Sequence, residues 1–230
     1  MLPLRDENPS QTIPFVTILL IAANIAVFIY QFTLGRAGQA FVFRFGAIPW
    51  EITHFAELPG LAPAFQTGWP NGVTLFTSMF LHGGVLHLAG NMLYLWIFGD
   101  NVESLTGHAR FLLFYIVCGL AAAFTHILLE PASTVPMIGA SGAISGVLGA
   151  YMIRFPRAHV HVLVFFIWLI RIVRMPALLV LGFWFVIQIF SGFGSLGMQE
   201  KGGTAWFAHI GGFAAGMVLI FLFQKRWTRN

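Results

Sequence analysis

The stretch VLHLAGNMLYLWIFG, residues 85–99, is an apolar run that carries two strongly polar side chains, His87 and Asn91. Five further apolar runs cover residues 13–34, 111–129, 141–155, 175–193 and 204–223. A helix rises about 1.5 Å per residue and the hydrocarbon core of a bilayer is about 30 Å thick, so runs of about 20 apolar residues are candidates for spanning helices. The pattern predicts an all-α polytopic membrane protein with a bundle of six transmembrane helices.

The composition agrees with this fold class. Of the 230 residues, 58% are hydrophobic and 9% are charged, whereas a soluble domain carries about 25% charged residues. This excludes a soluble globule, a disordered segment and a coiled coil. The single cysteine, Cys118, excludes an internal disulfide and a cysteine-based zinc site, and we expect no metal or cofactor. The basic residues do not cluster with aromatic ones, so no nucleic-acid partner is expected.

The basic residues predict how the chain lies in the membrane. With both termini in the cytoplasm, nine Lys and Arg residues fall inside and three, Arg36, Arg44 and Lys201, fall outside. This positive-inside bias favours an N-in, C-in topology. The loop over residues 35–80 then lies outside. We expect it to rest on the bilayer surface through its aromatic residues, Trp50, Phe55, Phe65 and Trp69.

We predict one membrane domain over residues 1–230, with a core at about 74–223 and short cytoplasmic tails at 1–12 and 224–230. The acidic flank before the first apolar run argues against a signal peptide. Residues 158–174 contain an apolar run, 162–170, that is too short to cross the membrane and is flanked by histidine and arginine residues. We predict that they lie at the interface, with the aromatic residues Phe165, Phe166 and Trp168 at the headgroup level.

Four polar side chains fall inside the predicted spans, where such groups are costly and mark functional sites. They are His87 and Asn91 in the second span, Ser141 at the start of the fourth and His209 in the sixth. The topology puts all four at similar depth, on the outer side. Taken singly, Ser141 could be a helix cap, His209 a core histidine, and His87 with Asn91 a polar pair joining two helices. Their shared depth favours one site.

Ser141 and His209 suit a nucleophile and its base. The fourth span is short, so Ser141 begins below the outer surface, where irregular backbone must be buried in protein or line a wet cavity. A serine needs a base to remove its proton, and His209 is the histidine able to reach it. Small residues, Gly142, Gly146, Gly212 and Gly216, would let the two helices approach closely. Gly139 and Gly142 flank the turn into the serine helix.

His87 and Asn91 are four residues apart and share one helix face. With the backbone N–H of Ser141 they could stabilise an oxyanion at an attacked carbonyl. His82 lies off this face, and we interpret it as structural or as lining the water access. No acid completes a triad, because Asp100 and Glu103 lie at the inner end of the second span, where bonding to helix ends or to Arg110 is expected. Three residues, Cys118, His126 and Glu130, are assigned no chemical role.

Three motifs resemble those of the rhomboid intramembrane serine proteases. LFTSMFLHGGVLHLAGNMLYLWIFGDNVE (75–103) resembles the family's second-span signature with its HxxxN, GASGAISG (139–146) resembles the nucleophile motif GxSG, and AHIGGFAAG (208–216) resembles AHxxGxxxG on the helix that carries the base. The resemblance covers most of residues 74–220. It implies Ser141 as nucleophile, His209 as base, an oxyanion site of His87, Asn91 and the Ser141 N–H, and transmembrane segments of other membrane proteins as substrates.

The chain departs from the family pattern at two places. Val73 and Thr74 stand where many members have Trp-Arg, and Ser145 stands where many have a tyrosine that packs under the base. Another aromatic residue, for example Tyr151 or Phe213, would then have to support His209.

Access to the site would be controlled by the fifth span. It is rich in aromatic residues, Phe183, Trp184, Phe185 and Phe190, although these could equally be lipid-facing bulk. A glycine-rich loop follows as a possible lid, with Gly192, Gly194, Gly197, Gly202 and Gly203.

Two other functions stay open from the sequence: a catalytically silent rhomboid-like protein that binds membrane clients, and a small transporter. Labelling of Ser141 by a serine-directed probe would separate the first from a protease. The transporter lacks support, because no inverted repeat and no paired intramembrane charges are visible. We expect a prokaryotic inner membrane as the location, with the site opening to the extracytoplasmic side. The oligomeric state does not follow from the sequence.

Overall fold

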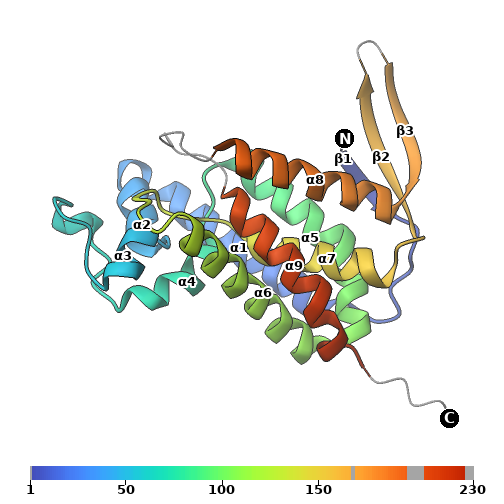
Figure 1. The fold of residues 1–230 in the computed structure, drawn as a ribbon, viewed down its shortest axis with the longest axis horizontal. Helices are drawn as coiled ribbons and strands as arrows, with labels where there is room; N and C mark the ends of the chain where they lie inside the picture. Colours follow the sequence, from blue (N-terminus) through green and yellow to red (C-terminus); the bar gives the residue numbers. More distant parts are fainter. Residues whose placement is uncertain (1, 167–168, 196–204, 226–230) are drawn as a thin grey trace.

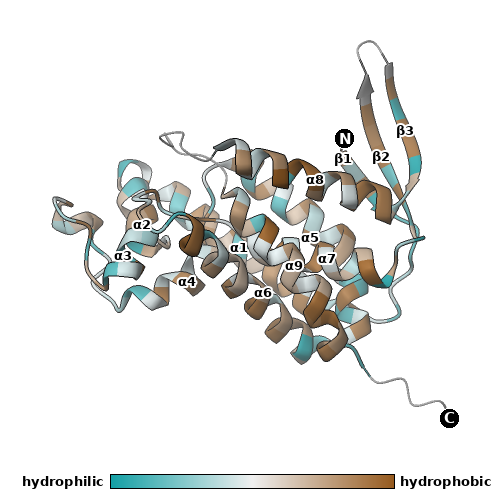
Figure 2. Cartoon of the chain, viewed as in Figure 1, coloured by the Kyte–Doolittle hydropathy of each residue, from teal (hydrophilic) through white to brown (hydrophobic). Residues whose placement is uncertain are grey.

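Each of the six predicted apolar segments contains a helix in the computed structural model, which describes residues 2–166, 169–195 and 205–225. The helices are α1 (Phe15–Thr33), α5 (Val85–Thr106), α6 (His108–Leu129), α7 (Ser141–Arg154), α8 (Ala177–Ser195) and α9 (Trp206–Phe223). They pack into a bundle (Figure 1), and hydrophobic residues run along α6, α8 and α9 (Figure 2). The core between them holds fully buried aromatic side chains, Phe98, Phe111, Phe114, Tyr151 and Phe213.

Four of these helices, α1, α6, α8 and α9, are each long and apolar enough to cross a membrane. Helix α5 meets the same criterion only together with the short helices over Asn71–Phe80, from which it is bent by 81°. Helix α7 has 14 residues and a length of about 21 Å, shorter than the hydrocarbon core. The chain is therefore an integral membrane protein of four or five such spans by length and composition, and the six-span count and the orientation remain predictions.

The all-α prediction is wrong in one respect, because the structure contains a three-stranded antiparallel sheet of order β1-β2-β3. Its strands are β1 (Leu2–Asp6), β2 (His159–Phe166) and β3 (Leu169–Pro176). The segment predicted to lie at the interface thus forms a hairpin, which projects from the bundle in Figure 1. Alternation explains it, because Val160 and Val162 are fully buried while His161 between them reaches Glu7. The aromatic side chains expected at the headgroups, Phe165, Phe166 and Trp168, lie outside the description.

The hairpin returns the chain to the end of the bundle that it left. The N–H of Ala177, the first residue of α8, donates to the carbonyl oxygen of Ala158 at 2.7 Å. Helix α7 therefore ends close to where α8 begins, and that the segment between them does not cross the membrane remains a prediction. The tail predicted over residues 1–12 is not free, since β1 pairs with β2 and Asp6 accepts a hydrogen bond from the Tyr151 hydroxyl at 2.5 Å.

The loop between α1 and α5 is built from short helices held by buried polar groups. They are η1 (Gly35–Ala37), α2 (Gly38–Phe45), α3 (Pro49–His54), η2 (Pro63–Phe65), η3 (Asn71–Val73), α4 (Thr74–Thr77) and η4 (Ser78–Phe80). Glu51 is buried and accepts a hydrogen bond from the Leu58 N–H at 3.0 Å. Burial raises the pKa of this carboxyl above its usual range. That the loop rests on the bilayer surface remains a prediction.

Glu103 bonds to a helix end, which is one of its two predicted roles, and that end is the start of α1. Its carboxylate accepts hydrogen bonds from the N–H groups of Val16 and Thr17 at 2.9 and 2.8 Å, and lies 2.6 Å from Nδ1 of His108. It therefore caps the first turn of α1, whose N–H groups have no acceptor within the helix. The expected contact with Arg110 does not occur in the described part of the chain.

Acidic conditions should weaken the attachment of β1 to the sheet. Hydrogen bonds from Arg174 and His161 hold the pKa of Glu7 below its usual value of about 4.3. A carboxyl with a depressed pKa contributes stability above its unfolded-state pKa and loses it as the pH falls through the folded-state value. We expect amide hydrogen exchange of residues 2–7, corrected for the intrinsic effect of pH, to rise as the pH falls below the usual pKa of a glutamate.

The variant Glu7→Gln should show the faster exchange already at neutral pH. Glu130→Gln is the matched control, because Glu130 follows α6 and lies outside the sheet. Equal protection of β1 in the Glu7→Gln variant and the unaltered chain would contradict this role for Glu7.

Candidate active site

Ser141 is the first residue of α7, and the segment that leads into it is tied to the first loop. Ala47 and Met137 exchange backbone hydrogen bonds at 3.1 and 2.8 Å, and the Gly139 N–H donates to the Ser78 carbonyl oxygen at 2.9 Å. Gly139 has φ +122°, a conformation that residues with side chains rarely adopt. These contacts hold the turn that presents the Ser141 side chain.

Ser141 and His209 lie in direct contact although 68 residues separate them in the sequence. The distance from Ser141 Oγ to Nε2 of His209 is 2.8 Å. The histidine is the fourth residue of α9 and is 8% exposed. A serine hydroxyl with an imidazole nitrogen at this distance is the arrangement that nucleophilic catalysis requires.

Two pairs of glycines bring α7 and α9 together at backbone distance. A Cβ atom on Gly212 would collide with the carbonyl oxygen of Gly142, and one on Gly216 would collide with that of Gly146. We call these four residues the glycine seam. The close approach that their spacing predicts is thus present, and it allows the side chains at the start of α7 and α9 to meet.

The second ring nitrogen of His209 has a partner that sequence reasoning missed. Nδ1 lies 2.8 Å from Oε1 of Gln188, which is 4% exposed and comes from α8. The amide nitrogen of Gln188 donates to the Trp184 carbonyl oxygen at 3.2 Å. A single amide in the apolar run of 175–193 was the available signal, because a polar side chain inside a span is costly unless it has a partner.

The aromatic side chains beside His209 are Trp184 and Trp206, with ring centroids 5.9 and 6.2 Å from the imidazole. The expectation that Tyr151 or Phe213 takes this position is wrong. Tyr151 bonds to Asp6 and packs edge-on to Phe98, and Phe213 stacks on Phe185. Trp184 comes from α8, one turn before Gln188, so α8 supplies two of the groups around the imidazole.

His87 and Asn91 face the turn at Gly139 from the same face of α5. A Cβ atom on Gly139 would lie 2.8 Å from Nε2 of His87 and 3.6 Å from Nδ2 of Asn91, so the glycine leaves room at these two nitrogens. The Gly83 N–H donates to Nδ1 of His87 at 3.3 Å, which leaves the hydrogen of a neutral ring on Nε2. Nδ2 of Asn91 is buried and has no acceptor among the described residues.

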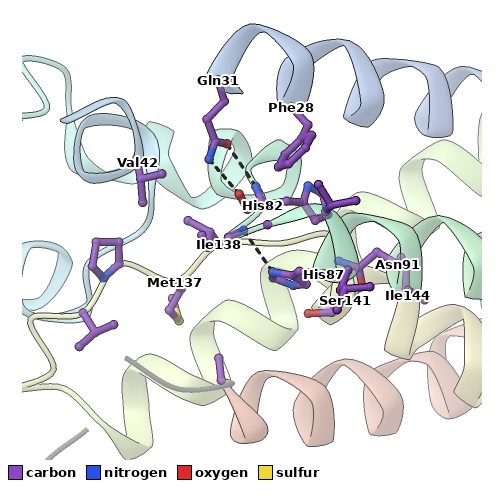
Figure 3. A pocket seen from close by; sticks show the side chains of 18 of the residues that line it. Phe28, Gln31, Val42, His82, His87, Asn91, Met137, Ile138, Ser141 and Ile144 are labelled. Carbon is purple, nitrogen blue, oxygen red and sulfur yellow. Dashed lines mark hydrogen bonds between the residues drawn. The ribbon is translucent and has the colours of Figure 1, made fainter. Parts of the chain in front are cut away.

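His82 is fully buried and its ring packs against that of His87. Gln31 of α1 bonds to its backbone, donating to the carbonyl oxygen at 2.8 Å and accepting from the N–H at 3.4 Å. Its ring meets His87 edge-on, with centroids 5.1 Å apart. Figure 3 shows the bonds from Gln31 to His82 and from Gly83 to His87.

One cavity of about 1280 Å³ is lined by Ser141, His87, Asn91, His82 and His209. Ser141, His87 and Asn91 lie side by side in it (Figure 3), and His209 and Trp184 contribute to its wall. The described residues contain no group of three His, Cys, Asp or Glu side chains that could hold a metal ion. The cavity therefore presents a hydroxyl, a base and two side-chain hydrogen-bond donors, in a lining that mixes apolar residues with further polar ones such as Gln31 and Ser145.

The aromatic residues of α8 fall into an exposed set and a set packed against α9, and control of access by α8 stays a prediction. Phe183 and Phe190 are exposed on the outside of the bundle, whereas Trp184 and Phe185 pack toward α9. Of the glycines proposed as a lid, Gly192 and Gly194 belong to α8. The others, Gly197, Gly202 and Gly203, lie outside the described residues.

Comparisons with known proteins identify the family of this sequence. The family model of the Rhomboid domain matches residues 69–226. RHOMBOID-like protein 1 of Arabidopsis thaliana is 29% identical over 93% of this chain and 54% of its own length. RHOMBOID-like protein 6, mitochondrial, of the same plant is 28% identical over 97% of this chain and 74% of its own length. Rhomboid protease GluP of Bacillus subtilis is 44% identical over 34% of this chain and 15% of its own length.

The chain spans about half the length of the first two curated relatives that it matches. The relatives come from plants, animals, yeast and bacteria, and several are named mitochondrial. A prokaryotic inner membrane, expected from the sequence, therefore gains no support from them. An integral membrane protein is what the family and the apolar helices establish.

Proposed function

Because the chain belongs to the rhomboid family, we propose that it is an intramembrane serine endopeptidase that cleaves transmembrane segments of other membrane proteins. Ser141 is the nucleophile and His209 the general base in this proposal. The observation that carries it is the 2.8 Å contact between Ser141 Oγ and Nε2 of His209 in a cavity among the helices.

The reaction begins when Ser141 Oγ attacks the carbonyl carbon of a peptide bond. A new C–O bond forms, the hydroxyl proton passes to Nε2 of His209, and the carbonyl oxygen becomes an anion. His209 then gives this proton to the amide nitrogen as the C–N bond breaks. Water, deprotonated by His209, then attacks the acyl carbon; the bond from that carbon to Ser141 Oγ breaks, Oγ takes back the proton from His209, and the acid product leaves.

The oxyanion is stabilised by the N–H of Ser141, Nε2–H of His87 and Nδ2–H of Asn91. Three features support this assignment: the first N–H groups of a helix lack an acceptor within it, the bond from Gly83 leaves a hydrogen on Nε2 of His87, and Nδ2 of Asn91 has no acceptor among the described residues. Donors fixed before the reaction stabilise developing charge without reorganising.

We also propose that the site opens toward the extracytoplasmic side and that substrates enter past α8. The orientation rests on nine basic residues predicted inside against three outside. The route rests on the exposed apolar face of α8, on which Phe183 and Phe190 are 54% and 75% exposed. A helical substrate would partly unwind to present a peptide carbonyl to Ser141.

A serine-directed fluorophosphonate tests this proposal. The purified protein in detergent should take up one probe molecule, and peptide mapping should locate it on Ser141 and not on Ser145, one turn further along α7. The same protein in liposomes should cut a reporter membrane protein within its transmembrane segment. A folded sample that neither reacts nor cuts would contradict the proposal and favour a protein that binds membrane clients without cleaving them.

A further inference from the structure

We propose that Gln188 is a positioning residue, which holds His209 in the tautomer whose Nε2 can accept the proton of Ser141. This inference rests on the function proposed above. Three hydrogen bonds form a chain from α8 through α9 to α7: Trp184 to Gln188, Gln188 to His209, and His209 to Ser141.

The direction of each hydrogen bond in this chain follows from the first one. The Trp184 carbonyl oxygen can only accept, so the group of Gln188 that faces it at 3.2 Å is the amide NH₂. The amide oxygen of Gln188 then faces His209, and because it too can only accept, Nδ1 of His209 carries the hydrogen. A neutral imidazole has one N–H, so Nε2 is left with a lone pair toward Ser141 Oγ.

The opposite tautomer would be unproductive. With its hydrogen on Nε2, His209 would donate to Ser141 and could not take up the serine proton. In the described part of the chain, Gln188 is the one side chain that bonds to Nδ1, and aromatic rings of Trp184 and Trp206 lie nearby. Removing the amide oxygen would leave a buried N–H without an acceptor, which removes the preference for the productive tautomer.

The amide also acts after the proton has moved. His209 then carries a positive charge in a site where Gln188 and His209 are only 4% and 8% exposed. A hydrogen bond from a charged group is stronger than one between neutral groups, so the amide oxygen stabilises the imidazolium more than the imidazole. A neutral amide does this without placing a buried carboxylate among apolar helices, where an unpaired charge is costly.

Gln188 makes the base dependent on α8. The side chains of α8 that are buried are few, namely Ala177, Val180, Leu181 and Gln188, together with Gly192. Of these, Gln188 alone can form a side-chain hydrogen bond. Displacement of α8 from α9 would therefore remove the acceptor from Nδ1 while leaving Ser141 and His209 in contact across the glycine seam.

The test compares Gln188→Leu and Gln188→Glu with the unaltered protein in liposomes, using reporter cleavage over a range of pH. Gln188→Leu should lower kcat by about 10- to 100-fold with little change in KM. Gln188→Glu restores an acceptor at the same position and should recover most of the activity. Its negative charge favours the protonated imidazole, so the acid limb of its kcat/KM profile should move to higher pH. Ile187→Leu, at the neighbouring lipid-facing position, is the matched control.

The outcomes distinguish a positioning role of Gln188 from a purely structural role. They also distinguish failure of this inference from failure of the proposed function. Activity of Gln188→Leu within about twofold of the unaltered protein would overturn the inference. So would an equal loss in both variants at every pH, with the acid limb unmoved. If Gln188→Leu fails to fold, the pH profile of Gln188→Glu alone decides. Failure of the unaltered protein to react with the fluorophosphonate would instead count against the proposed function.

Discussion

Replacing Ser141 by alanine, or His209 by glutamine, should lower the rate of reporter cleavage by about 10⁴-fold or more. The alanine lacks the attacking oxygen, and the glutamine fills similar space but cannot take up a proton. The double variant should be no slower than either single one, because groups that act as a unit lose their whole contribution when one is removed. The measurement is the initial rate of cleavage in liposomes at equal protein content.

Two variants control for the loss of a buried polar group near this site. Ser145→Ala removes a hydroxyl on the same helix that donates to the Ser141 carbonyl oxygen at 2.6 Å. His126→Gln removes a buried imidazole of α6 whose nearest aromatic ring, that of Phe207, lies 6.5 Å away. Both should retain most of the activity. Less than a tenfold loss in either Ser141→Ala or His209→Gln would refute the assignment of nucleophile and base.

Replacing Gly216 by valine should destabilise the protein by at least about 3 kcal/mol and abolish cleavage. A Cβ atom there would collide with the backbone of Gly146, which belongs to α7 and cannot rotate away as a side chain would. The helices must separate, and the contact between Ser141 and His209 depends on their approach. We expect a loss of stability at the upper end of the usual range for single substitutions, because the added side chain collides with backbone atoms.

Separation of the helices can be measured directly through the single cysteine. Cys118 is fully buried and lies against Gly146, so a thiol-reactive fluorophore should gain access to it only when the helices part. Thermal unfolding followed by this reaction should give a lower transition temperature for Gly216→Val. Ala214→Val adds a β-branched side chain two residues earlier, at an exposed position of α9, and should leave the transition unchanged. Equal transition temperatures in the two variants would disprove close backbone contact along the glycine seam.

Much of the candidate site could be predicted because the residues that it needs are recognisable in the sequence. A polar side chain inside an apolar run is conspicuous, and the depths inferred from charge placed Ser141, His209, His87 and Asn91 together. The glycine spacing on two of the predicted helices indicated a close approach, which the glycine seam displays. The resemblance to rhomboid proteins, drawn from three short motifs, is confirmed by the family match over residues 69–226.

Gln188 and Trp184 could not be predicted because hydropathy does not determine how α8 is turned about its axis. Its lipid-facing residues, such as Phe190, are as apolar as its buried residues, such as Leu181. Without a polar face opposite an apolar one, no periodicity shows which residues point toward His209. The single amide of the helix, Gln188, was the one feature of this segment from which its buried face could have been inferred.

The sheet and the cap on α1 were missed for another reason. Strand β1 pairs with residues about 150 positions away, and nothing in LPLRD indicates that partner. Glu103 was expected to bond to a helix end or to Arg110, but the sequence did not indicate which helix end; it bonds to backbone N–H groups of α1, more than 80 residues earlier in the chain. Backbone groups of distant elements are identical in every sequence, so a search among side chains does not find them.

The backbone contact along the glycine seam has a practical consequence for handling the protein. Ser141 and His209 are carried by α7 and α9, whose backbones are in direct contact. Helix α8 contacts these two helices only through a few buried side chains. Warming or a harsh detergent should loosen α8 long before α7 and α9 separate. An aged preparation would then still react with a small phosphonate while its turnover of a helical substrate had collapsed, so probe occupancy would overstate the share of competent molecules.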